Sequence, residues 1–95
     1  MPTYETPEAF LRQYRSLTPE QRKAFRAALK KFVADLESES FRPGLRVKAV
    51  QGLPTGFFDM TWAQNGQAIF RYGPELKPGE PHIIWYAVGT HGILP

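Results

Sequence analysis

The sequence predicts an α+β fold in which an N-terminal helical hairpin packs on a four-stranded antiparallel sheet. Two observations support this prediction. The first part of the chain contains two segments whose apolar residues recur at helical spacing, each introduced by a helix-start signal. From Leu45 onwards apolar and polar residues alternate instead, and connections rich in glycine and proline separate the alternating segments.

Each predicted helix has a recognisable start. Thr6-Pro7-Glu8 places a capping hydroxyl before a proline suited to the first helical position. Thr18-Pro19-Glu20-Gln21 has the spacing of a capping box. The apolar stripes comprise Phe10, Leu11, Tyr14 and Leu17 in the first helix, and Phe25, Ala28, Leu29, Phe32, Val33 and Leu36 in the second. Because little more than Thr18 separates the helices, we expect a tight hairpin whose aromatic residues belong to the core.

The strands follow a turn at Pro43-Gly44. Residues 45–49 alternate, with Arg46 and Lys48 between apolar neighbours, which predicts a strand with one basic face. Residues 57–62 predict a second strand. Asn65-Gly66 then predicts a tight hairpin, because both residues tolerate positive φ. The third and fourth strands are residues 67–72 and the buried segment that begins at residue 82, whereas residues 2–4 are too short to predict as an edge strand.

Composition restricts the class of protein. Cysteine is absent, so there is no disulfide framework and no thiolate metal site. No charged-then-apolar leader opens the chain, and no apolar run approaches the ~18 residues that a membrane helix needs. The hydrophobic fraction of 42% is ordinary for a globular protein. We expect a single globular domain over residues 1–95, located in the cytoplasm.

Basic residues are concentrated in the first half of the chain. All of them except Arg71 and Lys77 fall between Arg12 and Lys48, and residues 22–31 contain five basic residues and no acid. Such a face favours polyanions, of which nucleic acid is the commonest in the cytosol. The alternative is a solvated helix face whose charges only keep the protein soluble.

The chain has two histidines, His82 and His91. His91 follows the last predicted strand in a Gly89-Thr90-His91-Gly92 context that should leave it exposed, where an imidazole can act as general acid or base. An ordinary surface histidine has the same appearance. His82 opens the same strand at its other end, so the two do not pair and we expect no metal site.

Basic and aromatic side chains on the sheet are candidates for RNA contacts. Arg46 and Lys48 should share a strand face, and with Arg71 they could bind a phosphate and stabilise its negative charge. Tyr72 and Tyr86 could stack on bases, as could Trp85, although strand alternation sends Trp85 and its neighbour to opposite faces. The alternative is a solvated sheet face. Asp59 is a lone carboxylate with no visible partner.

The order of these features resembles the RelE/ParE toxin superfamily, closest to the RelE/YafQ-like branch that ends in Gly-Thr-His. The resemblance covers about residues 8 to 94. It rests on two amphipathic helices, residues 45–48 followed by Gly52-Leu53-Pro54, Trp62 with the Asn-Gly hairpin, and the strand leading into Gly89-Thr90-His91.

The resemblance implies the toxin of a type II toxin–antitoxin system, a ribosome-dependent endoribonuclease that cuts mRNA and inhibits translation. It implies a cognate antitoxin, the ribosome and mRNA as partners, and no metal, small-molecule cofactor or membrane. His91 matches the family's C-terminal acid/base residue. Arg71 is the second expected catalytic residue, a phosphate contact assigned by its placement on the sheet and not by a family motif. The expected RNA contacts are Arg46, Lys48, Gln67, Tyr72 and Tyr86.

The chain also departs from the family pattern. Many relatives carry an arginine directly after the hairpin glycine or one residue later, where this chain has Gln67 and Ala68. Loss of one charge-stabilising group typically slows a reaction by ~10²–10³-fold. The alternative is therefore a binding module without catalysis: a ParE-like gyrase inhibitor, or a degenerate RelE relative that binds only antitoxin or RNA.

Overall fold

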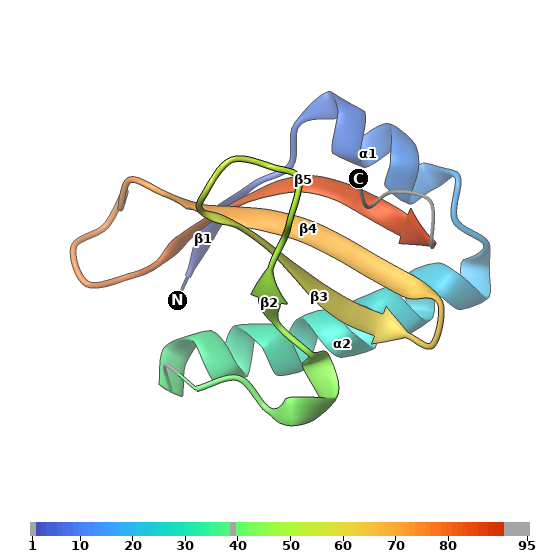
Figure 1. Cartoon of the computed structure of the whole chain (residues 1–95), viewed down its shortest axis with the longest axis horizontal. Coiled ribbons are helices and arrows are strands. Elements are labelled where there is room, and N and C mark those ends of the chain that lie inside the picture. Colours follow the sequence, from blue (N-terminus) through green and yellow to red (C-terminus); the bar gives the residue numbers. More distant parts are fainter. Residues whose placement is uncertain (1, 39, 91–95) are drawn as a thin grey trace.

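The computed structural model describes residues 2–38 and 40–90, and His91 lies outside these residues (Figure 1). Both predicted helices are present, and five strands form one sheet. In chain order the elements are β1 (Thr3–Glu5), α1 (Glu8–Arg15), α2 (Pro19–Ser38), the 3-10 helix η1 (Pro43–Leu45), β2 (Lys48–Ala49), β3 (Phe57–Ala63), β4 (Gly66–Gly73) and β5 (His82–Thr90).

The sheet has the order β1-β5-β4-β3-β2 and is mixed. β1 runs parallel to β5, and the other neighbouring pairs are antiparallel. The α+β class is confirmed, whereas the prediction of four antiparallel strands is wrong. A strand of three residues gives almost no alternation signal, so β1 is defined by its distant partner and not by its own sequence.

His82 is the side chain that joins β1 to β5. It is 1% exposed. Its Nε2 lies 2.6 Å from Oε2 of Glu5, and its Nδ1 lies 2.7 Å from Oγ1 of Thr3. A neutral imidazole protonated at Nε2 satisfies both contacts, donating to Glu5 and accepting from Thr3. His82 therefore has a structural role, and its partners are the two side chains that β1 places beside it.

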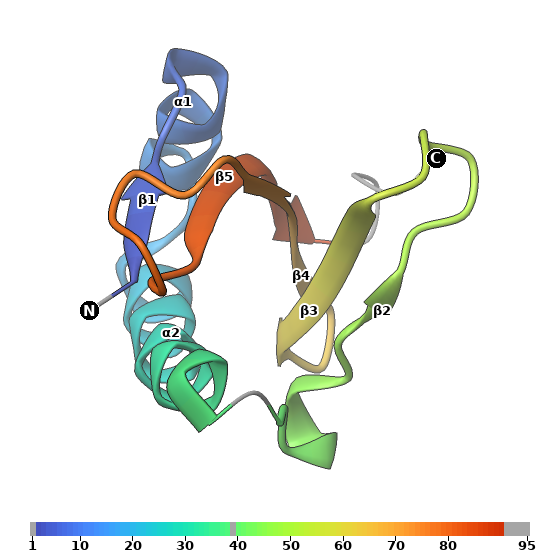
Figure 2. The ribbon, with the colours of Figure 1, turned by 90° about the vertical axis from the view of Figure 1, so that its left-hand side faces the viewer.

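Both helices lie on one face of the curved sheet, here called the inner face (Figure 2). Trp85 of β5 is the centre of the core on this face. Its ring is within 6 Å, centroid to centroid, of Phe10 from α1, Phe25 and Phe32 from α2, and Phe70 from β4. The helix aromatics thus belong to the core, as predicted. The other face of the sheet is called the outer face below.

The starts of the two helices differ. At α2 the Thr18 backbone N–H donates to Oε1 of Gln21, and the Gln21 N–H donates to Oγ1 of Thr18, so the predicted capping box is confirmed. At α1 the helix begins at Glu8 after Pro7, which has extended ψ and offers no side-chain cap, so Thr6 is not the capping residue.

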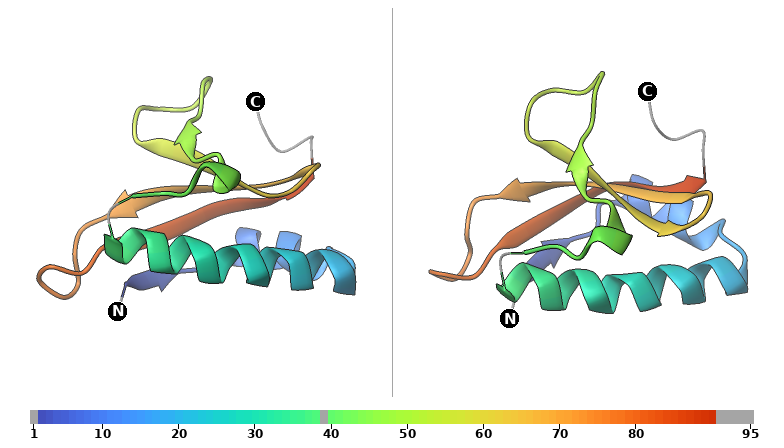
Figure 3. Two further views of the ribbon diagram at one scale, coloured as in Figure 1. Left: turned by 90° about the horizontal axis from the view of Figure 1, so that it is seen from below. Right: turned by 60° about the horizontal axis from the view of Figure 1, so that its bottom comes forward.

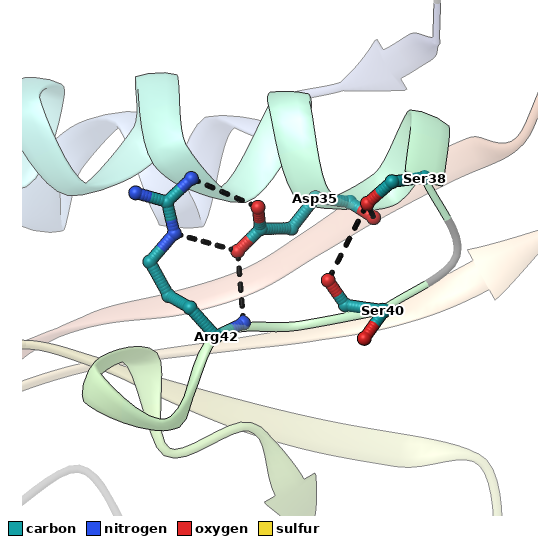
Figure 4. Close-up of polar contacts among 4 residues, drawn as sticks. All are labelled: Asp35, Ser38, Ser40 and Arg42. Atoms are coloured by element: carbon teal, nitrogen blue, oxygen red, sulfur yellow. Dashed lines mark hydrogen bonds and ion pairs between the residues drawn. The ribbon is translucent and has the colours of Figure 1, made fainter.

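The chain after α2 is anchored by Asp35 and Arg42 (Figure 4). Nε and Nη2 of Arg42 donate to Oδ2 and Oδ1 of Asp35 at 2.8 and 2.9 Å, and the Arg42 backbone N–H donates to Oδ2 at 2.9 Å. These bonds hold the pKa of Asp35 at about 2, below the usual 3.8, mainly because the Arg42 side chain stabilises the carboxylate. The anchor fixes where the chain turns back towards the sheet.

The predicted strand over residues 45–49 is mostly absent. Pro43–Leu45 form η1, and Arg46 caps it with a φ of 48°, in the left-handed region. Only Lys48 and Ala49 pair with β3. Pro43 favours the first turn of a helix, which explains the competing structure. Arg46 and Lys48 therefore do not form one basic strand face.

The predicted β3–β4 hairpin is confirmed, but its turn is Gln64-Asn65 and not the expected Asn65-Gly66, and neither Asn65 nor Gly66 has positive φ. Gly66 is needed there for a close approach and not for positive φ. A Cβ at this position would lie 2.5 Å from Cε2 of Trp62. The indole Nε1 of Trp62 donates to the backbone oxygen of Gln67 at 2.9 Å, which holds the ring over the glycine.

Candidate functional site

The outer face of the sheet collects the side chains best suited to binding an anion. In β3, Phe58, Met60 and Trp62 face the core, so Phe57, Asp59 and Thr61 face outwards. Side chains opposite one another in a ladder share a face. Lys48 is opposite Asp59, Arg71 is opposite Phe57, and Gln67 is opposite Thr61. The segment from β2 to the start of β3 stands on the side of the sheet away from α2 (Figure 3).

Tyr86 reaches the outer face through a β-bulge. β4 pairs Ile69 with Ala87 and Phe70 with Trp85, so Tyr86 is the extra residue on β5. It is 50% exposed, and its ring contacts Phe57 edge-to-face at a centroid distance of 5.1 Å. The opposite orientations expected for Trp85 and Tyr86 are confirmed. Phe57 and Tyr86 form an aromatic surface beside Arg71.

Asp59 lies at the centre of this face and is 2% exposed. Its Oδ1 is buried and has no hydrogen-bond partner among the described residues. Burial raises the pKa of Asp59 above its usual value, and the charge of Lys48 opposes this rise. Oε1 of Gln67 is the second buried side-chain oxygen without a partner in the described part of the chain.

The arrangement can bind phosphate and a flanking base. Lys48 and Arg71 are exposed on the same face and supply two positive charges. Arg71 has the planar donor geometry that suits a phosphate, and the Phe57–Tyr86 pair offers an apolar platform for a base. Asp59 lies among these groups but is 2% exposed, so it does not present its carboxylate to a ligand.

Several predicted site residues lie elsewhere. Tyr72 contacts Phe58 and Phe70 on the inner face, so it does not join Arg71 and Tyr86. Arg46 is exposed at the end of η1 and is not part of the sheet. His91 lies outside the described residues, so its position relative to Arg71 stays a prediction.

The basic residues of α2 are exposed on the side of the helix away from the core. The helix leaves Lys23, Arg26, Lys30 and Lys31 exposed. Lys31 lies nearest to the sheet, because it borders a hollow with Arg42 and with Thr61 of β3.

The sequence pattern does not mark Asp59 as a site residue. The available signal was an acid at an outward position of an otherwise apolar strand. What the sequence does not reveal is that Lys48 is opposite Asp59 and that the carboxylate is buried without a partner.

A cavity of about 650 Å³ lies away from this face, between the end of α2 and the loop before β5. Leu36, Phe41 and Tyr72 contribute apolar surface to it, and Glu37 and Glu75 line it with acid. An acidic lining disfavours a polyanion, so this cavity does not extend the candidate site on the outer face.

Within residues 2–38 and 40–90, no three His, Asp or Glu side chains cluster as a metal site would require. Neither helix in this part of the chain has the length and apolar character to cross a membrane.

Comparison with known proteins shows a shared fold. No protein-family model matches the chain, and no curated protein matches its sequence. Among solved structures, a copper-bound mutant toxin from Helicobacter pylori is similar, with a TM-score of 0.63, 12% sequence identity and 96% of each chain covered. The chain therefore shares the fold of that protein. Membership of the RelE/ParE superfamily stays a prediction.

Proposed function

We propose that this protein is the toxin of a type II toxin–antitoxin system and that it cleaves mRNA on the ribosome. The observation that supports the proposal is the outer face, where Lys48 and Arg71 lie around Asp59 and beside the exposed Phe57–Tyr86 pair. The fold shared with the Helicobacter pylori toxin agrees with this function. The partners would be a cognate antitoxin, the ribosome and mRNA in the cytoplasm.

In the proposed reaction the substrate 2′-hydroxyl loses its proton to water, and its oxygen forms a bond to the adjacent 3′-phosphorus while the bond from phosphorus to the 5′-oxygen breaks. Arg71 binds the phosphate and stabilises the charge that develops on it, with Lys48 as a second cation. Tyr86 and Phe57 stack against a neighbouring base. His91 protonates the departing 5′-oxygen, the role that the resemblance implies. The products are a 2′,3′-cyclic phosphate and a free 5′-hydroxyl.

A second candidate is a protein that binds without cleaving, such as a gyrase inhibitor. The observation that favours it is Gln67, which occupies the place of the expected arginine and carries no charge. Its side-chain oxygen is also buried. Lys48 and Arg71 would then bind a partner surface or RNA without chemistry.

Cell-free translation separates the two candidates. The wild-type chain should cut the ribosome-bound message at positions that end in a cyclic phosphate, and His91→Ala and Arg71→Ala should cut it much more slowly. An intact message, together with inhibition of DNA supercoiling by gyrase, would reject the nuclease and support the binding protein.

A further inference from the structure

Two buried oxygens on the outer face lack hydrogen-bond partners, and they come from neighbouring strands. Within residues 2–38 and 40–90, Oδ1 of Asp59 on β3 and Oε1 of Gln67 on β4 are the only buried side-chain nitrogen or oxygen atoms without a partner. Both are acceptors as long as Asp59 is ionised. Buried polar groups are nearly always paired, and one proton between these two oxygens would satisfy both of them.

The ladder between β3 and β4 places the two side chains close together. Asp59 is opposite Ile69, and Thr61 is opposite Gln67, so Asp59 and Gln67 are diagonal neighbours on one face of the sheet. Diagonal neighbours lie roughly 7–8 Å apart at Cα, and long side chains reach across this separation. A hydrogen bond between the two side chains, direct or through one water, is therefore compatible with the register.

The charges around Asp59 do not hold its carboxyl group in the ionised form. The two cations that face it are Lys48, opposite on β2, and Arg71, at the other diagonal position on β4. Neither forms an ion pair with Asp59 in the described part of the chain. β5 adds Tyr86 to this face, and the loop of residues 50–56 has no charged residue. Burial raises the pKa of Asp59 more than Lys48 lowers it, which favours the neutral acid.

The amide nitrogen of Gln67 lies at the surface. The residue is half-buried, and its Nε2 is neither bonded to a described residue nor among the buried atoms without a partner. With Oε1 turned inwards, the amide presents its N–H groups on the outer face, where a phosphate oxygen can accept them. The reverse orientation would turn the carbonyl oxygen outwards and repel a phosphate.

We propose that Asp59 is a positioning residue whose neutral carboxyl group donates a hydrogen bond to Oε1 of Gln67, directly or through one water, and so holds the Gln67 amide nitrogen towards an RNA phosphate. The contact with RNA rests on the proposed function, whereas the bond between the two side chains exists without RNA. Gln67 then supplies a neutral donor beside Lys48 and Arg71, which supply the charge.

Asp59→Asn and Asp59→Leu test this role. The asparagine amide has nearly the same shape as the neutral acid and also donates to Gln67, whereas leucine has no donor. Carbon-13 and nitrogen-15 NMR would follow the Asp59 carboxyl group and the Gln67 side-chain amide of the free protein across pH. Filter binding of a short single-stranded RNA would compare both variants with Gln67→Ala and with the control Glu37→Gln, which removes an exposed charge on α2. Circular dichroism and urea unfolding would show that each variant folds.

Asp59 should stay protonated at pH values where an exposed aspartate is ionised, and the Gln67 amide signals should shift as Asp59 titrates. Asp59→Asn and Glu37→Gln should bind RNA like wild type at low pH. As the pH rises through the pKa of Asp59, wild type should bind progressively more weakly than Asp59→Asn. Asp59→Leu and Gln67→Ala should each weaken binding by ~3–10-fold, the contribution of one hydrogen bond, and the double variant should lose no more than either single variant.

The assignment would be overturned if Asp59 titrated like an exposed aspartate, or if the Gln67 amide signals did not respond to its titration. Binding that is as weak in Asp59→Asn as in Asp59→Leu would also overturn it, because the amide should replace the acid as donor. If the NMR signals behaved as expected but the folded wild type bound no RNA, the bond between the side chains would stand, and the contact with RNA would be rejected together with the proposed function.

Discussion

Gly66→Ala is expected to destabilise the fold because Trp62 occupies the space that a Cβ needs. The added carbon would lie 2.5, 2.6 and 2.7 Å from three atoms of the Trp62 ring, whereas ordinary contacts begin near 3.4 Å. The ring must therefore move by roughly 1 Å in a closely packed core, where such strain is costly. Trp62 is 7% exposed and packs edge-to-face on Phe25, which restricts the movement of its ring.

The magnitude follows from what that movement breaks. Overpacking costs ~1–3 kcal/mol. The hydrogen bond from Trp62 Nε1 to the Gln67 oxygen contributes ~1 kcal/mol, and the edge-to-face contact between Trp62 and Phe25 contributes ~0.5–1.5 kcal/mol. The loss of chain entropy in the unfolded state returns ~0.4–1 kcal/mol. We expect a net loss of about 2–4 kcal/mol from the free energy of unfolding.

Urea unfolding followed by tryptophan fluorescence would measure this loss. Gly44→Ala is the matched control, because a Cβ there meets no atom within 4 Å and Gly44 is not among the glycines with positive φ. Its free energy of unfolding should stay within ~0.5 kcal/mol of wild type or rise slightly. If Gly66→Ala were as stable as Gly44→Ala, the explanation of the hairpin glycine by Trp62 would be refuted.

Three further predictions concern charge. Arg42 lowers the pKa of Asp35 to about 2. The pair therefore stabilises the fold fully above the usual pKa of 3.8, and this stabilisation is lost as the pH falls towards 2. In Arg42→Ala, the free energy of unfolding measured in urea should depend less on pH over this range. Burial raises the pKa of Asp59, so the wild-type fold loses stability as the pH rises through that pKa. Asp59→Asn does not titrate at this position. Its free energy of unfolding in urea, relative to wild type, should therefore increase over the same pH range. Arg71→Ala should weaken RNA binding in filter-binding assays and reduce the slope of log affinity against log salt concentration by about one. Tyr72→Ala, on the inner face, should leave both the affinity and this slope nearly unchanged.

The helices and the hairpin could be predicted because their signals are local. The capping box of Thr18 and Gln21 lies within four residues, and the apolar stripe of α2 repeats over its whole length. β1 and β2 could not be predicted, because they are three and two residues long and depend on distant partners. The bonds from Arg42 to Asp35 fix the position of the chain just before η1. Arg46 therefore follows η1 as its C-cap and does not lie in the expected strand.

The sequence predicts only part of the candidate site, because only part of it depends on local patterns. Alternation predicts which residues of each strand share a face, such as the opposite orientations of Trp85 and Tyr86. That Lys48, Arg71 and Tyr86, from three different strands, lie on one face depends on the register between the strands. The importance of Asp59 depends on burial and on a missing partner. Both are properties of the folded molecule, so the sequence shows only an isolated acid.

The central claim is that the outer face cleaves RNA, and the most direct test is to map the ends of ribosome-bound mRNA after incubation with the purified protein. The account predicts defined cuts that leave a 2′,3′-cyclic phosphate and a 5′-hydroxyl, with strong loss of cutting in Arg71→Ala and no loss in Tyr72→Ala. An uncut message with the folded wild-type protein bound to the ribosome would contradict it.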